Sequence, residues 1–197
     1  MSSRLRRAKL RHNACLEDIN YRHPRGLDKS LMTSMVTCQW LKEHLNVLIT
    51  GPAGVGKTWI ACALAHQACR EGYTALYLRL PRLLHDVALA RGDGRYPRLL
   101  RSLAKLDLLV IDDWGLAKLT PDNLRDLLEI LEDRYAARST VVTSQLPIEK
   151  WHDLIGEPTF ADAILDRLIH NAYKLKLKGG SLRKKKSPLT QPDHSQA

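Results

Sequence analysis

The sequence predicts an α/β fold with an open, mostly parallel β-sheet and helices on both faces. Short apolar segments alternate with helix-forming segments along most of the 197 residues, as expected where crossover helices connect parallel strands. The segment "LLVIDDWG" (108–115) begins with four apolar residues, which indicates a strand buried on both faces. The glycine-rich segment "GPAGVGKT" (51–58) lies between an apolar strand and a helix-forming segment. Ligands of such sheets bind at the carboxyl ends of the strands.

The first half of the chain supplies two of the expected strands. A lead-in, residues 1–45, has a basic start, a turn-prone "HPRGLD" and then a helix to about Leu45. The strand "NVLIT" (46–50) precedes the glycine-rich segment, and the helix after it ends at Gly72. A second strand, "YTALYLRL" (73–80), is followed by a helix that begins at Pro81 and runs to about Ala90.

The second half supplies three more strands. A loop and a short helix lead to the strand "LDLLVIDD" (106–113). Thr120 as N-cap, followed by Pro121, begins a helix over 120–138 with leucines at helical spacing. The expected elements that follow are a strand at 139–145, a helix at 160–172 and an alternating, half-exposed strand at 173–178. The sequence thus predicts a lead-in (1–45), a sheet domain that contains the glycine-rich segment (46–178) and a basic, disordered tail (179–197).

The composition indicates a globular protein with basic ends. Hydrophobic residues make up 44% and charged residues 26%, which are ordinary values. The net charge of +10 is uneven, because residues 1–11 and 174–186 carry many Lys and Arg and no acid, whereas the body is near neutral. Such ends suit a polyanion, most simply nucleic acid. The alternative is a solvated tail that binds nothing.

The cysteines and the apolar segments predict a cytoplasmic protein. The four cysteines show no CxxC pair and no metal-ligand spacing, so we expect free thiols in a reducing compartment. No apolar run is long enough to span a membrane. The basic N-terminus lacks the apolar region of a signal peptide.

The segment "GPAGVGKT" matches the phosphate-binding P-loop pattern G-x-x-x-x-G-K-[ST] in the required strand-to-helix context. Its glycines let backbone N–H groups surround phosphates. Lys57 supplies a point charge for the outer phosphates, and the Thr58 hydroxyl is placed to bind Mg²⁺. The expected nucleotide-binding residues are Gly51, Pro52, Ala53, Gly54, Val55, Gly56, Lys57, Thr58 and Trp59.

A P-loop enzyme needs a second strand that delivers a carboxylate to the metal, and "LLVIDD" is that strand. Asp112 is the expected Mg²⁺ partner. Asp113, on the opposite side of a regular strand, is the expected acid that orients or deprotonates the attacking water. The alternative for Asp113 is a turn acid before Trp114. At the end of the strand at 139–145, a hydroxyl or amide of Thr143, Ser144 or Gln145 could hold the water, or could only form a turn.

These segments together resemble the IstB family, AAA+ ATPases that assist transposases of one insertion-sequence group and are similar to DnaC-type helicase loaders. The resemblance rests on "GPAGVGKT", "LLVIDDWG", "STVVTSQLPIEKWHDLIG" and "ADAILDRLIHNAYKLKLKGGSLRKK". It covers roughly residues 8–184 and also includes the lead-in "LEDINYRHPRGLD". Relatives usually have a further N-terminal helical region, so the lead-in looks truncated, and no C-terminal lid domain is evident.

The resemblance implies roles for further residues. Ser144 or Gln145 falls at the sensor position, and Arg167 falls where the family carries an arginine finger that reaches the nucleotide of a neighbouring subunit. The alternative for Arg167 is a surface arginine paired with Asp162 or Asp166. Arg183 falls at a second sensor-like position, or is one more charge of the tail.

A basic segment follows the second strand. In initiator-type AAA+ proteins this region faces the central channel, and a basic segment there suits DNA phosphates without reading bases. The alternative is a solvated helical face. The expected DNA contacts are Arg79, Arg82, Arg91, Arg95, Arg98, Arg101 and Lys105.

The resemblance therefore implies an ATP- and Mg²⁺-dependent helper of a transposase. Such a protein would form homo-oligomers on duplex DNA, independently of sequence, and hydrolyse ATP at subunit interfaces. Two alternatives remain at this stage: a DnaC-type helicase loader, or an inactive remnant that binds nucleotide but does not assemble.

Overall fold

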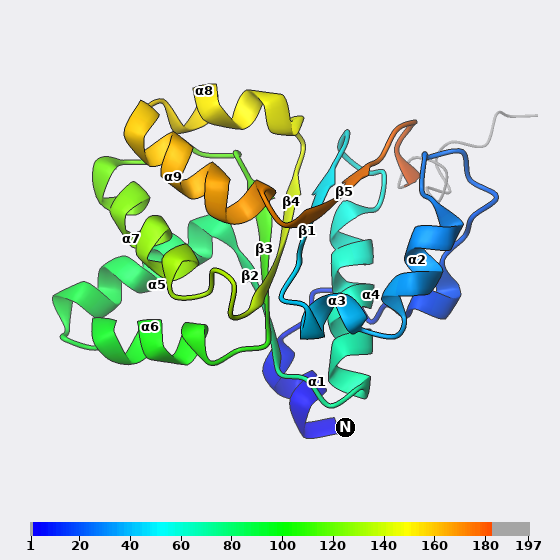
Figure 1. Cartoon of the computed structure of the whole chain (residues 1–197), viewed down its shortest axis with the longest axis horizontal. Coiled ribbons are helices and arrows are strands. Elements are labelled where there is room, and N and C mark those ends of the chain that lie inside the picture. Colours follow the sequence, from blue (N-terminus) through cyan, green and yellow to red (C-terminus); the bar gives the residue numbers. More distant parts are fainter. Residues whose placement is uncertain (1, 183–197) are drawn as a thin grey trace, which may run out of the picture.

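The computed structural model describes residues 2–182 and contains a five-stranded, parallel sheet (Figure 1). The strand order is β2-β3-β4-β1-β5, and each neighbouring pair is parallel. The strands are β1 (Asn46–Thr50), β2 (Ala75–Arg79), β3 (Leu108–Trp114), β4 (Ser139–Ser144) and β5 (Ala172–Lys176). The predicted α/β fold with a mostly parallel sheet is confirmed.

Helices cover both faces of this sheet (Figure 1). On one face lie α1 (Ser2–Ala8), the 3-10 turn η1 (Leu16–Asp18), α2 (Lys29–Met35), α3 (Gln39–Lys42) and α4 (Lys57–Arg70). On the other lie α5 (Leu80–Gly92), α6 (Tyr96–Ala104), α7 (Pro121–Glu132), the 3-10 turn η2 (Ile148–Lys150), α8 (Trp151–Ile155) and α9 (Pro158–Ile169).

Each face of the sheet has its own apolar core, because neighbouring strand residues point to opposite sides. In β3, Leu108 and Val110 belong to the core under α4, whereas Leu109 and Ile111 belong to the core under α5 to α9. All four are fully buried. The run of apolar residues thus reflects a central strand covered on both sides, as predicted.

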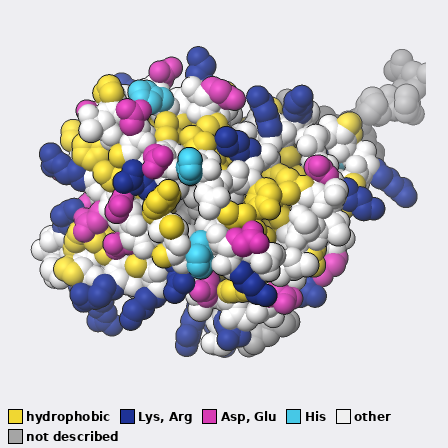
Figure 2. Space-filling model, viewed as in Figure 1, with side chains coloured by type: hydrophobic (Ala, Val, Ile, Leu, Met, Phe, Trp, Pro, Cys, Tyr) yellow, Lys and Arg dark blue, Asp and Glu magenta, His cyan; other side chains and the backbone are white. Residues whose placement is uncertain are grey.

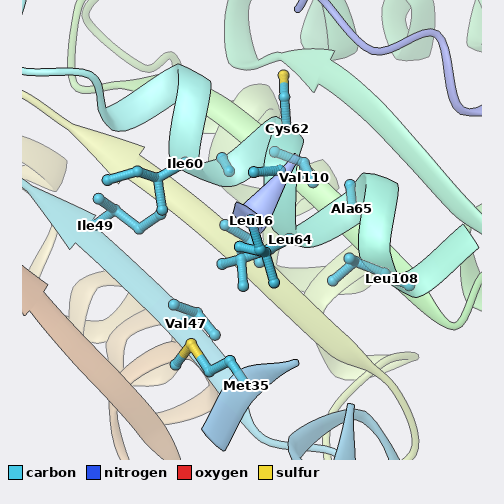
Figure 3. Close-up of a cluster of buried hydrophobic side chains, with 14 of the residues drawn as sticks. Leu16, Met35, Val47, Ile49, Ile60, Cys62, Leu64, Ala65, Leu108 and Val110 are labelled. Atoms are coloured by element: carbon cyan, nitrogen blue, oxygen red, sulfur yellow. The ribbon is translucent and has the colours of Figure 1, made fainter. Parts of the chain in front are cut away.

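The lead-in packs into the core of the domain. Leu16 and Met35 belong to the same buried cluster as Val47 of β1 and Leu64 of α4 (Figure 3). The expected continuous helix to Leu45 is instead two short helices, α2 and α3, separated at Cys38, which has a left-handed φ of 54°. A residue in that conformation interrupts a helix, so the apolar residues reach the core from two directions.

The helix expected over 120–138 is shorter than predicted at its carboxyl end. It begins as expected, with Thr120 and Asn123 forming a reciprocal capping box, but it ends at Glu132. Arg134, just beyond, is 1% exposed and donates hydrogen bonds to the carbonyls of Leu103, Leu106 and Ser139. Burial lowers the pKa of Arg134 to about 9, so its guanidinium stays charged at neutral pH. This arginine ties the end of α7 to α6 and β4.

The short helix α8 has no counterpart in the expected elements. It is held by tertiary packing: the ring of Trp151 lies 5.2 Å from that of Trp114, and its indole N–H donates to the carbonyl of Leu146. Five residues are too few for helical periodicity to be recognised. The helix completes the cover over the end of β3.

Candidate nucleotide-binding site

The P-loop connects the carboxyl end of β1 to the first turn of α4. Gly54 and Gly56 have φ angles of 82° and 97°, which L-residues rarely adopt. The Lys57 ammonium lies inside the loop, where it donates to the carbonyls of Gly51 (2.7 Å) and Pro52 (2.8 Å). The loop therefore wraps around its own lysine in the geometry expected of a phosphate cradle at a helix N-terminus.

The segment after β5 lies directly against this loop. A Cβ atom on Gly51 would lie 2.4 Å from the carbonyl oxygen of Leu177, and one on Gly54 would lie 2.1 Å from the Ser181 Oγ. The Leu182 N–H also donates to the Gly54 carbonyl at 2.9 Å. Gly51 and Gly54 are thus required by the close approach of residues 177–182 as well as by the shape of the loop. Arg183, the expected second sensor, lies outside the described residues.

The other residues of the loop differ in their surroundings. Pro52 and Ala53 are exposed at its tip, whereas Val55 is buried in the core. Trp59 is partly buried and packs against the core under α4. The tip is the most exposed part of the loop.

Thr58 and Asp112 meet across the site, although they are far apart in the sequence. The Thr58 hydroxyl lies 3.0 and 3.2 Å from the two carboxylate oxygens of Asp112. Asp112 is fully buried, and the Thr143 hydroxyl also donates to it. A hydroxyl and a carboxylate are ligands that Mg²⁺ accepts beside nucleotide phosphates. Thr58 and Asp112 would therefore hold such an ion together with the phosphates of a nucleotide.

Two residues around Asp112 were not predicted from the sequence. The Tyr77 hydroxyl of β2 donates to Asp112 at 2.5 Å, and the Arg11 guanidinium lies 4.0 Å from the same carboxylate. Burial, followed by the hydrogen bond to Asp112, raises the pKa of Tyr77 above its usual range. Hydrogen bonding with Tyr77 raises the pKa of Arg11. The lead-in thus reaches the expected metal site through Arg11.

Asp113 does not continue the regular alternation of β3. It has a φ of 64°, and the register to β4 shifts by one residue between Ile111 and Trp114, which defines a bulge. The expectation of a regular strand through both acids was therefore wrong. The Asp113 carboxylate is partly exposed and accepts from the Nε of Arg79 at 2.6 Å.

The polar residues at the end of β4 have three different surroundings. The Thr143 hydroxyl contacts Asp112. The Ser144 hydroxyl donates to the Trp114 carbonyl (2.8 Å) and accepts from the Leu146 N–H (3.1 Å), so it closes the turn after β4. Gln145 is exposed. The structure places Thr143, rather than either expected sensor, against the carboxylate of Asp112.

Arg167 lies at the opposite end of the sheet from the P-loop. The carbonyl of Arg167 accepts from the side chain of Asn46, the first residue of β1, whereas the P-loop follows the last residue. A strand of five residues spans roughly 13 Å. The Arg167 guanidinium pairs with Glu132 (2.6 Å) and Asp166 (3.5 Å) and lines a pocket of about 280 Å³ at this end. It is therefore remote from the P-loop of its own chain.

The residues of the basic segment divide into paired and unpaired groups. Arg79 pairs with Asp113, Arg82 with Asp86, Arg95 with Asp93, and Arg91 with Asp126, and Arg91 also stacks on Tyr96. The other three are exposed on or just after α6 and form no ion pair with any residue of 2–182; they are Arg98, Arg101 and Lys105.

The cysteines of the structure are unpaired thiols. Three are buried, and burial raises the pKa of Cys38 to about 11. Among residues 2–182, no helix has the length and apolar character needed to cross a membrane.

Comparison with known proteins identifies the family. The family model for the IstB-like ATP binding protein matches residues 1–190. A Sinorhizobium fredii protein named "Putative insertion sequence ATP-binding protein y4pL" is 56% identical, with 93% of this chain and 75% of that protein covered. An ATP-binding protein of the insertion sequence IS21 from Pseudomonas aeruginosa, similarly named, is 31% identical over 94% of this chain and 70% of its own.

Solved structures share the fold at low sequence identity. The crystal structure of DnaI superposes with a TM-score of 0.71 at 19% identity, covering 90% of this chain and 94% of that chain. The crystal structure of the DnaC helicase loader superposes with a TM-score of 0.67 at 17% identity, covering 84% of this chain and 97% of that chain. These similarities confirm the P-loop AAA+ fold and, with the family match, the predicted resemblance. The chain belongs to the IstB-like family of ATP-binding proteins.

Proposed function

We propose that this protein is an ATPase that assists an insertion-sequence transposase, assembling as a homo-oligomer on duplex DNA and hydrolysing ATP between subunits. The observation that supports hydrolysis is the cluster at the carboxyl edge of the sheet, where Lys57, Thr58, Asp112 and Asp113 come together. Lys57 would neutralise the outer phosphates, and Thr58 with Asp112 would hold Mg²⁺. Asp113 would orient or deprotonate the attacking water.

The placement of Arg167 supports hydrolysis at an interface between subunits. This guanidinium lies at the amino edge of the sheet, so it cannot serve the nucleotide of its own chain. In a head-to-tail assembly the amino edge of one subunit would face the carboxyl edge of the next. Arg167 would then stabilise negative charge that develops in the transition state.

The unpaired cations of α6 support binding of DNA through its phosphates. Lys and Arg side chains gather over α6 at the lower left of the view in Figure 2. Arg98, Arg101 and Lys105 are available because they form no ion pair within residues 2–182. Backbone contacts of this kind give affinity that falls with salt and does not depend on sequence.

The first test is the ATPase rate with and without duplex DNA. We expect DNA to raise turnover, and we expect Lys57→Ala to abolish it because the point charge on the phosphates is lost. The stimulation should fall steeply as salt is raised. A rate that is measurable but unchanged by DNA would contradict the proposed coupling. Capture of a replicative helicase rather than the transposase would favour the helicase-loader alternative.

The ion pair between Arg79 and Asp113 yields a second prediction. A DNA phosphate would compete with Asp113, 2.6 Å from the Nε of Arg79, for the charge of this guanidinium. Arg79→Ala should therefore raise the rate without DNA, by up to about fivefold for an exposed ion pair, and should reduce the stimulation by DNA. Arg82→Ala is the matched control, because Arg82 pairs with Asp86 on α5. A lower basal rate in Arg79→Ala would show that the pair instead keeps Asp113 in position.

A further inference from the structure

Arg25 of the lead-in lies against the P-loop. Its side chain is buried, with only 4% of the residue exposed. The Nη1 atom donates to the Val55 carbonyl at 3.2 Å, and a Cβ atom built on Gly56 would lie 2.7 Å from the same nitrogen. The Arg25 carbonyl accepts from the Lys178 N–H at 2.8 Å. The guanidinium of Arg25 is therefore held on the phosphate cradle, while its backbone is held by the segment after β5.

The charge of Arg25 has no counter-ion within residues 2–182. No carboxylate of the described chain pairs with it, and its buried Nε has no hydrogen-bond acceptor. Burial lowers the pKa of Arg25, as expected for a cation removed from water without an anion. Burying a charge is costly unless it is paired. An unbalanced cation in this position indicates that the anion comes from a ligand.

The adjacent cradle defines which ligand this is. Lys57 and the N-terminus of α4 also present positive charge to the same loop, and the chain belongs to an ATP-binding family. We propose that Arg25 is a nucleotide-binding residue whose charge is balanced by the polyphosphate of the bound nucleotide, while its Nη1 holds the Val55 carbonyl. This proposal rests on the nucleotide site described above and adds to it a residue from outside the P-loop.

A purely structural role for Arg25 makes opposite predictions for stability. If Arg25 only supports the Val55 carbonyl, its removal lowers the melting temperature of the nucleotide-free protein and leaves the stabilisation by nucleotide intact. If the charge of Arg25 is balanced only when a polyphosphate binds, then Arg25→Met removes an unpaired buried charge from the nucleotide-free protein. The nucleotide-free protein should melt at an equal or higher temperature, and the increase caused by nucleotide should be smaller.

The experiment measures binding and melting of the full chain without DNA. For Arg25→Met we expect ATP to bind roughly 10-fold more weakly, the effect of one lost charge-assisted interaction, with a smaller loss for ADP. Inorganic tripolyphosphate should show the same loss as ATP, because the effect depends on the phosphates. Arg25→Lys should recover part of the affinity. Arg22→Met is the matched control: Arg22 is exposed in the same loop, so the affinity should stay within about twofold.

Three results would overturn the proposal. The first is that Arg25→Met loses the same affinity for ATP, ADP and the uncharged nucleoside adenosine. The second is that Arg25→Met lowers the melting temperature of the nucleotide-free protein, while ATP still raises that temperature by as much as in the wild type. The third is an affinity loss in Arg22→Met as large as in Arg25→Met. These measurements need no turnover, DNA or second subunit. The inference about Arg25 can therefore fail while the ATPase proposal stands, and the reverse also holds.

Discussion

Asp113→Asn should keep ATP binding and lose turnover, by about 1,000-fold, the range of a lost general base. The change removes the acceptor of the water proton but leaves the P-loop, Lys57, Thr58 and Asp112 unaltered. Affinity for ATP should stay near the wild-type value, because Asp113 lies in the bulge of β3 and pairs with Arg79 rather than with the loop. Binding of a fluorescent ATP analogue and single-turnover hydrolysis together separate the two effects.

A matched control is Asp122→Asn, which makes the same chemical change at an exposed surface residue of α7. It should leave both binding and turnover unchanged. If Asp113→Asn retained turnover, the second acid would be a structural partner of Arg79 at the end of β3. Asp113→Glu is also informative, because the bulge and the ion pair leave little freedom for a longer side chain. A partial rate in that variant would show that the position of the acid is critical.

Arg167→Ala should reduce DNA-stimulated turnover by about 1,000-fold, the lower part of the range for an arginine that acts across an interface. Nucleotide binding to the isolated subunit should not change, because Arg167 lies at the amino edge of the sheet. The charged partners of its guanidinium are the exposed carboxylates of Glu132 and Asp166, from which a stronger anion can withdraw it. The measurement is the rate at saturating DNA across a range of protein concentrations.

Mixing two inactive variants tests whether Arg167 acts on a neighbour. Subunits with Arg167→Ala retain an intact P-loop and Asp113, whereas subunits with Asp113→Asn retain Arg167. Mixed in equal amounts, they should recover activity at the interfaces where each supplies what the other lacks. Recovery would not occur if Arg167 acted within its own chain. Arg125→Ala is a suitable control, since Arg125 pairs with Asp122 on the surface of α7.

The strands and the phosphate loop were predictable because their signals are local. "GPAGVGKT" carries its own geometry in consecutive residues, and the apolar runs of β1, β3 and β4 reflect burial on both faces. The N-terminus of α7 was also predictable, because Thr120 and Pro121 act on the adjacent turn. Each of these features depends on residues that are neighbours along the chain.

Other features were missed because their causes lie far away in the sequence. Tyr77 and Arg11 reach Asp112 only after β2 and the lead-in have packed beside β3. The bulge at Asp113 depends on pairing with β4 and has no signature in "LLVIDDWG". The carboxyl end of α7 depends on Arg134, whose partners lie on three other segments.

By itself the sequence determined the class of sheet, the phosphate cradle and the acid that meets Thr58. The alternation of strand-forming and helix-forming segments, the spacing of the glycines and the placement of the charges can be read from neighbouring residues. They can therefore be recognised without knowing the tertiary contacts. Only the tertiary structure decided the surroundings of those groups. It placed Arg79 on Asp113, Thr143 on Asp112, Arg167 at the opposite edge and Arg25 on the P-loop. Ion pairs and buried hydrogen bonds form between segments separated by 30 residues or more, and packing alone selects which of the available partners meet.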